Sequence, residues 1–234
     1  MRNVKPVESR AKDLFPGLPE RNREARERYG LKAGGHDFDH DAAVAHFVWI
    51  IAEDEETRFL GVAAAWCHSA DHMLEKRLGV PHAPKEETEN LVRWMLEAVP
   101  ELTPEEKVRV VHVVLHHEGR NQDTDPPLQV ALNDADRLAN MLTTLLVRSG
   151  QFHPDLPVVD PVHWENDPKA SYYEPGATFW DTNNCRKWAD ETGPYILRLP
   201  KAREFGKALA AFLGLYMEVT KLQYKMMGLD PYPY

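Results

Sequence analysis

Residues 59–68 read Phe-Leu-Gly-Val-Ala-Ala-Ala-Trp-Cys-His, and this stretch decides the fold. From Phe59 to Trp66 the side chains are apolar on nearly every side of a helix. A helix that is apolar all round has no face to present to water, so it belongs in the centre of a bundle. The stretch therefore predicts a helical protein packed around this segment.

Helical patterns continue on both sides of that stretch. Thr103-Pro104-Glu105-Glu106 is typical of a helix start, with Thr103 as the cap and Pro104 in the first helical position. In residues 37–55 the apolar side chains recur at helical spacing: Val44, Phe47, Val48, Ile50 and Ile51. Further helices are expected at about 20–30 (ended by Gly34-Gly35), 91–96, 128–148 and 203–227. The predicted fold class is all-α.

The segment 151–200 differs in composition from the rest. It is rich in aromatic residues and in prolines, namely Pro154, Pro157, Pro161, Pro168, Pro175, Pro194 and Pro200. This proline content disfavours a regular helix over most of the segment. The prediction is one domain over 1–234, with a core at about 20–150, an irregular excursion at 151–200 and a C-terminal helix at 201–228. The excursion is expected either to cover a site or to pack as a surface segment.

Charge and cysteine content restrict the function. The formal net charge is -9, which argues against binding a nucleic-acid polymer, because phosphate backbones attract basic surfaces. The two cysteines, Cys67 and Cys185, suggest neither a disulfide framework nor a thiolate zinc site. Neither a signal-peptide core nor a stretch of transmembrane length is found, so we expect a soluble, cytoplasmic protein without a membrane partner.

Three chemistry-bearing side chains stand in helical segments. His40 precedes Asp-Ala-Ala-Val-Ala, His68 follows Ala-Ala-Trp-Cys, and Asp136 lies in Asp-Ala-Asp-Arg-Leu. Imidazoles and carboxylates that project from neighbouring helices are the groups with which a helical core binds a divalent metal ion. These three residues are the predicted metal ligands.

The order of these three segments resembles the HD-domain superfamily of metal-dependent phosphohydrolases over roughly residues 30–148. That family has a His early on one helix, a His-Asp pair ending an apolar helix, and a later Asp in an Ala-Asp-Arg-Leu type segment. The resemblance implies an HD-domain helical bundle and hydrolysis of a nucleotide or another small phosphomonoester or phosphodiester. It also implies a divalent ion: manganese, iron, zinc, cobalt, nickel or magnesium.

The chain departs from the family pattern at Ser69, which stands where the paired Asp is expected. Asp71 lies three residues after His68, close to the same helix face, and is the predicted substitute ligand. The alternative is an HD-fold binding or regulatory protein that has lost catalysis. A di-iron oxygenase is a third option, disfavoured because the bridging Asp is missing.

Other residues are candidates for supporting roles. His116 or His117, with Asp134 or Glu118 nearby, is expected to assist the attacking water or the leaving group. Asp134 and Asp136 point about 200° apart on a helix, so both cannot bind one ion. The weaker candidates for contacts with a substrate phosphate are His36, Lys76 and Arg137. Each of them also has a structural explanation, as a helix-start, surface or salt-bridge residue.

The expected partner is a small phosphorylated substrate. The apolar C-terminal helix suggests in addition a homodimer, although it could equally pack onto its own bundle.

Overall fold

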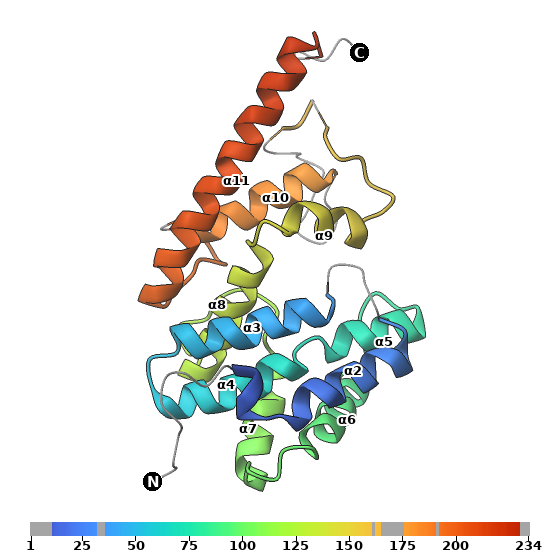
Figure 1. Ribbon diagram of the computed structural model, residues 1–234, viewed down its shortest axis with the longest axis vertical. Coiled ribbons are helices and arrows are strands. Elements are labelled where there is room, and N and C mark those ends of the chain that lie inside the picture. Colours follow the sequence, from blue (N-terminus) through green and yellow to red (C-terminus); the bar gives the residue numbers. More distant parts are fainter. Residues whose placement is uncertain (1–10, 32–35, 161, 165–175, 191, 230–234) are drawn as a thin grey trace. The chain divides into compact units, whose positions relative to one another are not determined.

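The computed structural model describes residues 11–31, 36–160, 162–164, 176–190 and 192–229 (Figure 1). The described part is helical and contains no strand, so the all-α prediction is confirmed. Its first eight helices are α1 (Ala11–Leu14), α2 (Gly17–Tyr29), α3 (Phe38–Ile51), α4 (Glu55–Cys67), α5 (Ala70–Leu78), α6 (Lys85–Leu96), α7 (Pro104–Val114) and α8 (Pro127–Asn140). The others are α9 (Leu145–Phe152), α10 (Thr178–Arg186), the short 3-10 helix η1 (Lys187–Ala189) and α11 (Pro200–Met226).

The chain divides into two compact units, Met1–Ala139 and Asn140–Tyr234. The first unit contains all of the predicted site residues, so the site can be described within it. The prediction that residues 1–234 form one domain stays a prediction.

Helix α4 is the centre of the first unit. It contacts α3, α7, α2 and α6 (Figure 1), and every residue from Leu60 to Cys67 is buried. This is the environment predicted for a helix that is apolar all round. His68 follows directly after α4, so its imidazole starts from the buried end of the central helix.

Helix α3 packs closely along α4, and a glycine makes this possible. A Cβ built on Gly61 of α4 lies only 2.6 Å from Cγ1 of Val48 in α3. Val48 and Leu60 are both fully buried. The missing side chain at Gly61 thus lets the two helices that carry His40 and His68 approach each other.

Caps fix where the site-bearing helices begin. The Asp37 side chain accepts a hydrogen bond from the backbone N–H of His40 at 2.9 Å, which starts α3. Thr103 and Glu106 form a reciprocal capping box before α7, as the sequence predicted for Thr103. Gly34-Gly35, the predicted end of the first charged helix, lies outside the described residues, and α2 ends earlier, at Tyr29.

The second unit contains the described part of the predicted excursion. This part includes one helix that the proline content did not predict, α10, which contacts α9 and α11. Phe179, Trp180 and Trp188 are buried, so these aromatic side chains contribute to packing. Tyr172 and Tyr173 lie outside the described residues, as do Pro161, Pro168 and Pro175.

Helix α11 begins at Pro200 and ends at Met226, close to the predicted C-terminal helix. Its exposed large apolar side chains are Phe205, Phe212, Leu215, Val219, Leu222 and Met226. The predicted homodimer through this helix stays a prediction. Among the described residues, no helix combines the length and the apolar character needed to cross a bilayer.

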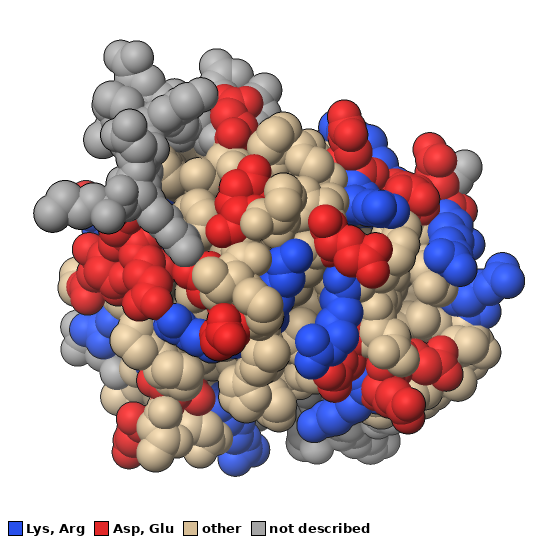
Figure 2. All heavy atoms as spheres, turned by 90° about the horizontal axis from the view of Figure 1, so that it is seen from below, with Lys and Arg blue, Asp and Glu red and all other residues tan. Residues whose placement is uncertain are grey.

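Acidic and basic side chains are interspersed on the face of the molecule shown in Figure 2. Among the described residues on that face, acidic side chains stand between the basic ones.

We predict that Gly61→Ala lowers the free energy of unfolding by about 1–2 kcal/mol. The added methyl group overpacks the contact with Val48, at a cost of about 1–3 kcal/mol, while alanine's better helix propensity returns up to about 1 kcal/mol. The matched control is Gly150→Ala in α9, where a Cβ meets nothing within 4 Å. Urea unfolding of both variants tests the packing, and equal stability for Gly61→Ala and the wild type contradicts it.

Candidate metal site

The three predicted metal ligands lie together in the first unit. His40 Nε2 is 3.1 Å from Asp136 Oδ1 and 3.2 Å from His68 Nε2, and His68 Nε2 is 3.7 Å from the same Asp136 oxygen. The residues come from α3, the end of α4 and α8, so segments nearly a hundred positions apart meet at one point. Together they form a group of donor atoms able to hold a metal ion.

The separations fit shared coordination. Two donors at about 2.1 Å from one ion lie about 3.0 Å apart at a right angle and about 3.4 Å apart at the tetrahedral angle. The observed distances of 3.1, 3.2 and 3.7 Å are close to these values. Lone-pair atoms this close together need a hydrogen-bonding proton or a metal ion between them.

The tautomer of His68 suits a ligand. Its Nδ1 lies 2.7 Å from the carbonyl oxygen of Ala65, which can only accept, so Nδ1 carries the proton and donates. The lone pair of Nε2 therefore faces Asp136 and His40. A hydrogen bond from the remote nitrogen is the usual way in which a protein orients a metal-binding imidazole.

Asp136 provides the negative charge of the group and is its most exposed member. Burial raises the pKa of this carboxyl, but the hydrogen bond from His40 and the nearby rings of His68 and His117 together hold it well below its usual range. The side chain keeps 23% of its surface accessible, whereas those of His40 and His68 keep 0% and 1%. Asp136 is thus the member of the group with appreciable accessible surface.

Behind the two histidines lies a buried network around Asp41, a residue with no predicted role. Asp41 is fully buried and forms an ion pair with Arg26 of α2. Asn22, one turn earlier in α2, donates to Asp41 at 2.6 Å and to the Trp66 carbonyl at 2.8 Å. The network ties α2, α3 and the end of α4 together beside His68.

The charge of Asp41 is stabilised from several sides. Burial alone raises the pKa of its carboxyl, but the His68 ring, the Arg26 guanidinium and the His40 ring together hold the pKa below 3.8. The Ser69 hydroxyl donates to the same carboxylate at 2.6 Å and contributes to the lowering. Asp41 is therefore an anion at neutral pH.

Asp71, the predicted substitute ligand, is not part of the group formed by His40, His68 and Asp136. It belongs to a second group with His72 and Glu118. Burial alone lowers the pKa of His72, but Asp71, Glu75 and Glu118 raise it to about 10. His72 is thus positively charged at neutral pH.

His36 lies between the two groups. Its ring is edge-on to the ring of His40, with centroids 5.1 Å apart, and it stacks on His72 with centroids 3.9 Å apart. Asp37, by contrast, acts as the cap of α3. The helix start, the structural explanation that the sequence offered for His36, is therefore provided by Asp37, and His36 contacts His40 and His72 instead.

Of the two adjacent histidines after α7, His117 faces the site. It is buried, and its ring centroid lies 5.5 Å from that of His68. Its Nδ1 donates to the Val114 carbonyl at 2.7 Å, which leaves Nε2 with a lone pair. His116 is exposed and lies against His112, with ring centroids 4.5 Å apart.

The remaining candidates lie elsewhere. Asp134 is fully buried, lies 3.8 Å from Arg137 and belongs to neither donor group. Arg137 donates to the Asn121 side chain at 2.6 Å and to the Gly119 carbonyl at 3.1 Å, so it holds the loop after α7. Lys76 is exposed near the end of α5.

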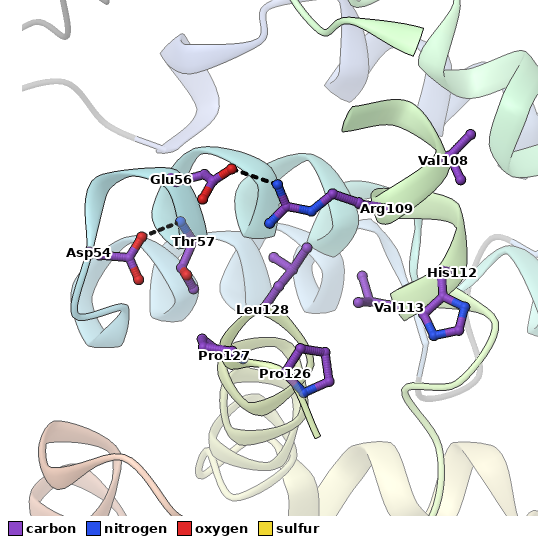
Figure 3. A pocket seen from close by; sticks show the side chains of 10 residues that line it. All are labelled: Asp54, Glu56, Thr57, Val108, Arg109, His112, Val113, Pro126, Pro127 and Leu128. Carbon is purple, nitrogen blue, oxygen red and sulfur yellow. Dashed lines mark hydrogen bonds and ion pairs between the residues drawn. The ribbon is translucent and has the colours of Figure 1, made fainter. Parts of the chain in front are cut away.

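A separate pocket of about 500 Å³ lies in the same unit (Figure 3). Its lining residues are Asp54, Glu56, Thr57, Val108, Arg109, His112, Val113, Pro126, Pro127 and Leu128. Arg109 reaches across to Glu56 at 2.5 Å. None of the ten belongs to either donor group.

The positions of His117 and Asp41 could have been predicted in part from the sequence. The buried valines of α7 include Val110, Val113 and Val114, and extending their spacing by one turn gives His117 rather than His116. Asp41 follows His40 directly in a helix that is otherwise largely apolar, so a buried carboxylate there needed a cationic partner. The sequence did not indicate that Arg26 is that partner.

We predict that Arg26→Met lowers the free energy of unfolding by about 3–5 kcal/mol, because it leaves the Asp41 carboxylate buried without its guanidinium. Arg28→Met is the matched control, since Arg28 is exposed in the same helix, and we expect a change within about 0.5 kcal/mol.

The loss of stability in Arg26→Met should depend on pH. The pKa of Asp41 is lowered in the folded protein, so its charge contributes stability above pH 3.8 that is lost as the pH falls further. The difference between the wild type and Arg26→Met should therefore be full at neutral pH and shrink in acid. A difference that grows in acid contradicts the role of the pair.

The chain resembles known proteins in fold rather than in sequence. No family model matches the chain, and no curated protein matches its sequence. Among solved structures, a Lactobacillus plantarum protein determined as a structural-genomics target matches with a TM-score of 0.66 and 17% identity. The match covers 90% of this chain and 98% of that one.

A second solved structure, Bacillus subtilis YpgQ in complex with ADP, matches with a TM-score of 0.51 and 20% identity, over 91% of this chain and 98% of that one. At these identities the matches show a shared fold and nothing more.

Proposed function

We propose that the protein is a metal-dependent phosphohydrolase of the HD type that acts on a small phosphorylated substrate. The observation that carries the proposal is the convergence of His40 Nε2, His68 Nε2 and Asp136 Oδ1 within 3.1–3.7 Å. Two imidazoles and one carboxylate from three helical segments are a donor set that suits manganese, iron, zinc, cobalt or nickel, and magnesium where oxygen donors dominate.

A divalent ion in this position supplies a bound water of lowered pKa and a Lewis acid for the phosphoryl oxygens. The protein's own residues then divide the remaining tasks. His40 and His68 are buried and hold fixed donor atoms, while the accessible side of Asp136 leaves an approach for the substrate. Fixed donor atoms of this kind keep a bound ion and its ligands in one geometry, which favours a positioned attack on phosphorus.

His117 is the proposed general base. Its Nδ1–H is held by the Val114 carbonyl, so its Nε2 is the atom able to take the proton of the attacking water. His72 carries a positive charge at neutral pH and lies against His36. Its charge is balanced by the carboxylates of Asp71, Glu75 and Glu118, so these groups, rather than a substrate phosphate, are its partners.

The proposed substrate class is the nucleotides, with other small phosphate esters next. The support is the structural match to a YpgQ–ADP complex, together with the net charge of -9, which disfavours polymeric nucleic acids. The fold likeness raises the priority of nucleoside phosphates in a substrate screen.

Ser69 favours a second candidate, a binding or regulatory protein on the same fold. A neutral hydroxyl stands where the resemblance expects a carboxylate ligand, and this lowers the negative charge in direct contact with the ion. Such a protein would bind the metal ion and a phosphorylated ligand without turning the ligand over.

We predict that the purified protein binds about one divalent ion per chain and hydrolyses an aryl phosphate, and that His68→Ala loses both properties because it removes a donor atom. His46→Ala is the control, since His46 is exposed on α3, the helix that carries His40. Metal analysis and an aryl-phosphate assay provide the readouts. Metal binding without turnover of aryl phosphates or nucleotides supports the second candidate, and unchanged metal content in His68→Ala refutes the site.

We predict that His117→Ala lowers kcat by about 10²–10⁴-fold, the usual contribution of a general base, while metal content stays at the wild-type level. His116→Ala is the matched control, because the neighbouring imidazole is exposed and turned toward His112. Assays of kcat across pH test the assignment. An equal loss in both variants, or a loss in His116→Ala alone, contradicts it.

A further inference from the structure

We propose that Ser69 and Asp41 together replace the carboxylate that the family resemblance expects at position 69. Ser69 Oγ supplies the oxygen that faces the metal ion, and Asp41 supplies the negative charge behind it. The inference deepens the proposed function and rests on its metal site.

The first support is the direction of the hydrogen bond between the two residues. Ser69 Oγ lies 2.6 Å from Asp41 Oδ1, and both side chains are fully buried. An ionised carboxylate can only accept, so the single hydroxyl proton of Ser69 points at Asp41. The lone pairs of the serine oxygen are consequently directed away from Asp41.

The second support is what lies on the other side of that oxygen. Ser69 Oγ is 3.4 Å from His68 Nε2, the atom that also approaches His40 and Asp136. Since the proton of His68 is on Nδ1, this contact joins two lone-pair donors. Its length equals the separation of about 3.4 Å between two ligands of one tetrahedral ion.

The third support is the position of Asp41 relative to Ser69 and His68. Its Oδ1 accepts from Ser69 and lies 3.4 Å from His68 Nδ1, so a single carboxylate oxygen stands behind two of the donor residues. Its Oδ2 is held by Asn22 and Arg26. A carboxylate in this position orients the ligands and makes both more electron-rich.

The arrangement also explains why an aspartate fits poorly at position 69. A carboxylate at this site would stand within hydrogen-bond distance of the Asp41 carboxylate, and like charges at that distance disfavour joint ionisation. Within this network, a serine keeps an oxygen in place and leaves one negative charge instead of two.

The experiment is a calorimetric titration of the metal-free full-length protein with Mn²⁺ and with Zn²⁺. Ser69→Ala removes the oxygen and leaves the Arg26–Asp41 pair intact, and we expect it to weaken binding by about 10- to 100-fold, the usual effect of losing such a partner. Ser69→Thr keeps the hydroxyl and should bind within a few-fold of the wild type. Thermal unfolding of the metal-free variants separates lost affinity from lost folding.

Ser149→Ala is the matched control. Ser149 is also buried and donates to an aspartate, Asp181, at 2.7 Å, but it lies in the second unit. Its removal should leave metal affinity unchanged.

Two further variants test whether the residues act as a unit. Asp41→Asn should weaken binding as Ser69→Ala does, and the double variant should lose little more than either single one. Ser69→Asp alone should bind the metal ion no more tightly than the wild type. Ser69→Asp combined with Asp41→Asn should bind it more tightly than Ser69→Asp alone, because the repulsion between the carboxylates at positions 41 and 69 is gone.

The outcomes are distinguishable. A wild type that binds neither ion overturns the proposed function and this inference with it. A wild type that binds, with Ser69→Ala equally tight, overturns the inference alone, and it does so even if Asp41→Asn does not fold. Ser69→Asp binding more tightly than the wild type in the presence of Asp41 overturns it as well.

Discussion

The close packing of α3 on α4 sets the distance between the two imidazoles, and the remainder of the site depends on this distance. Gly61 lets Val48 approach the axis of α4, and one helix then holds His40 while the other ends at His68. Neither histidine needs a flexible loop to reach the other. The donors therefore belong to the core of the first unit, where small side-chain displacements are opposed by dense packing.

Charge is distributed in layers around that core. His40, His68 and Asp136 form the inner layer, with the only appreciable exposure at Asp136. Asp41 and Arg26 lie behind them as a buried ion pair, and Asn22 satisfies atoms of α2, α3 and α4 together. Such a pair contributes little net stability by itself but strongly penalises any arrangement that separates its members. It therefore specifies how the helices meet.

Much of this could be predicted from sequence because it depends on local patterns. The apolar stretch before His68 predicted a central helix, Thr103 predicted a helix start, and the segments around His40, His68 and Asp136 predicted donors on helices. These features are encoded within single helices, where spacing maps directly onto a face.

What could not be predicted depends on contacts between helices. Asp71 lies close to His68 in sequence, yet its carboxylate joins Glu118 and His72 because α5 begins as a separate helix after Ser69. The partners of Asp41 come from α2 and from Ser69, 15 and 28 residues away. Helix α10 was missed because prolines on both sides of it dominated the pattern.

The contacts of Arg26 have a thermodynamic consequence. Its guanidinium also binds the carbonyl of His36, so one side chain of α2 fastens both the start of the α3 segment and the anion behind His68. Docking of α2 and binding of the proposed ion to His40, His68 and Asp136 would therefore be linked equilibria, in which tightening either one tightens the other. Amide exchange in α2, a helix that contributes no donor atom, would slow when the ion is present and would serve as a remote reporter of it.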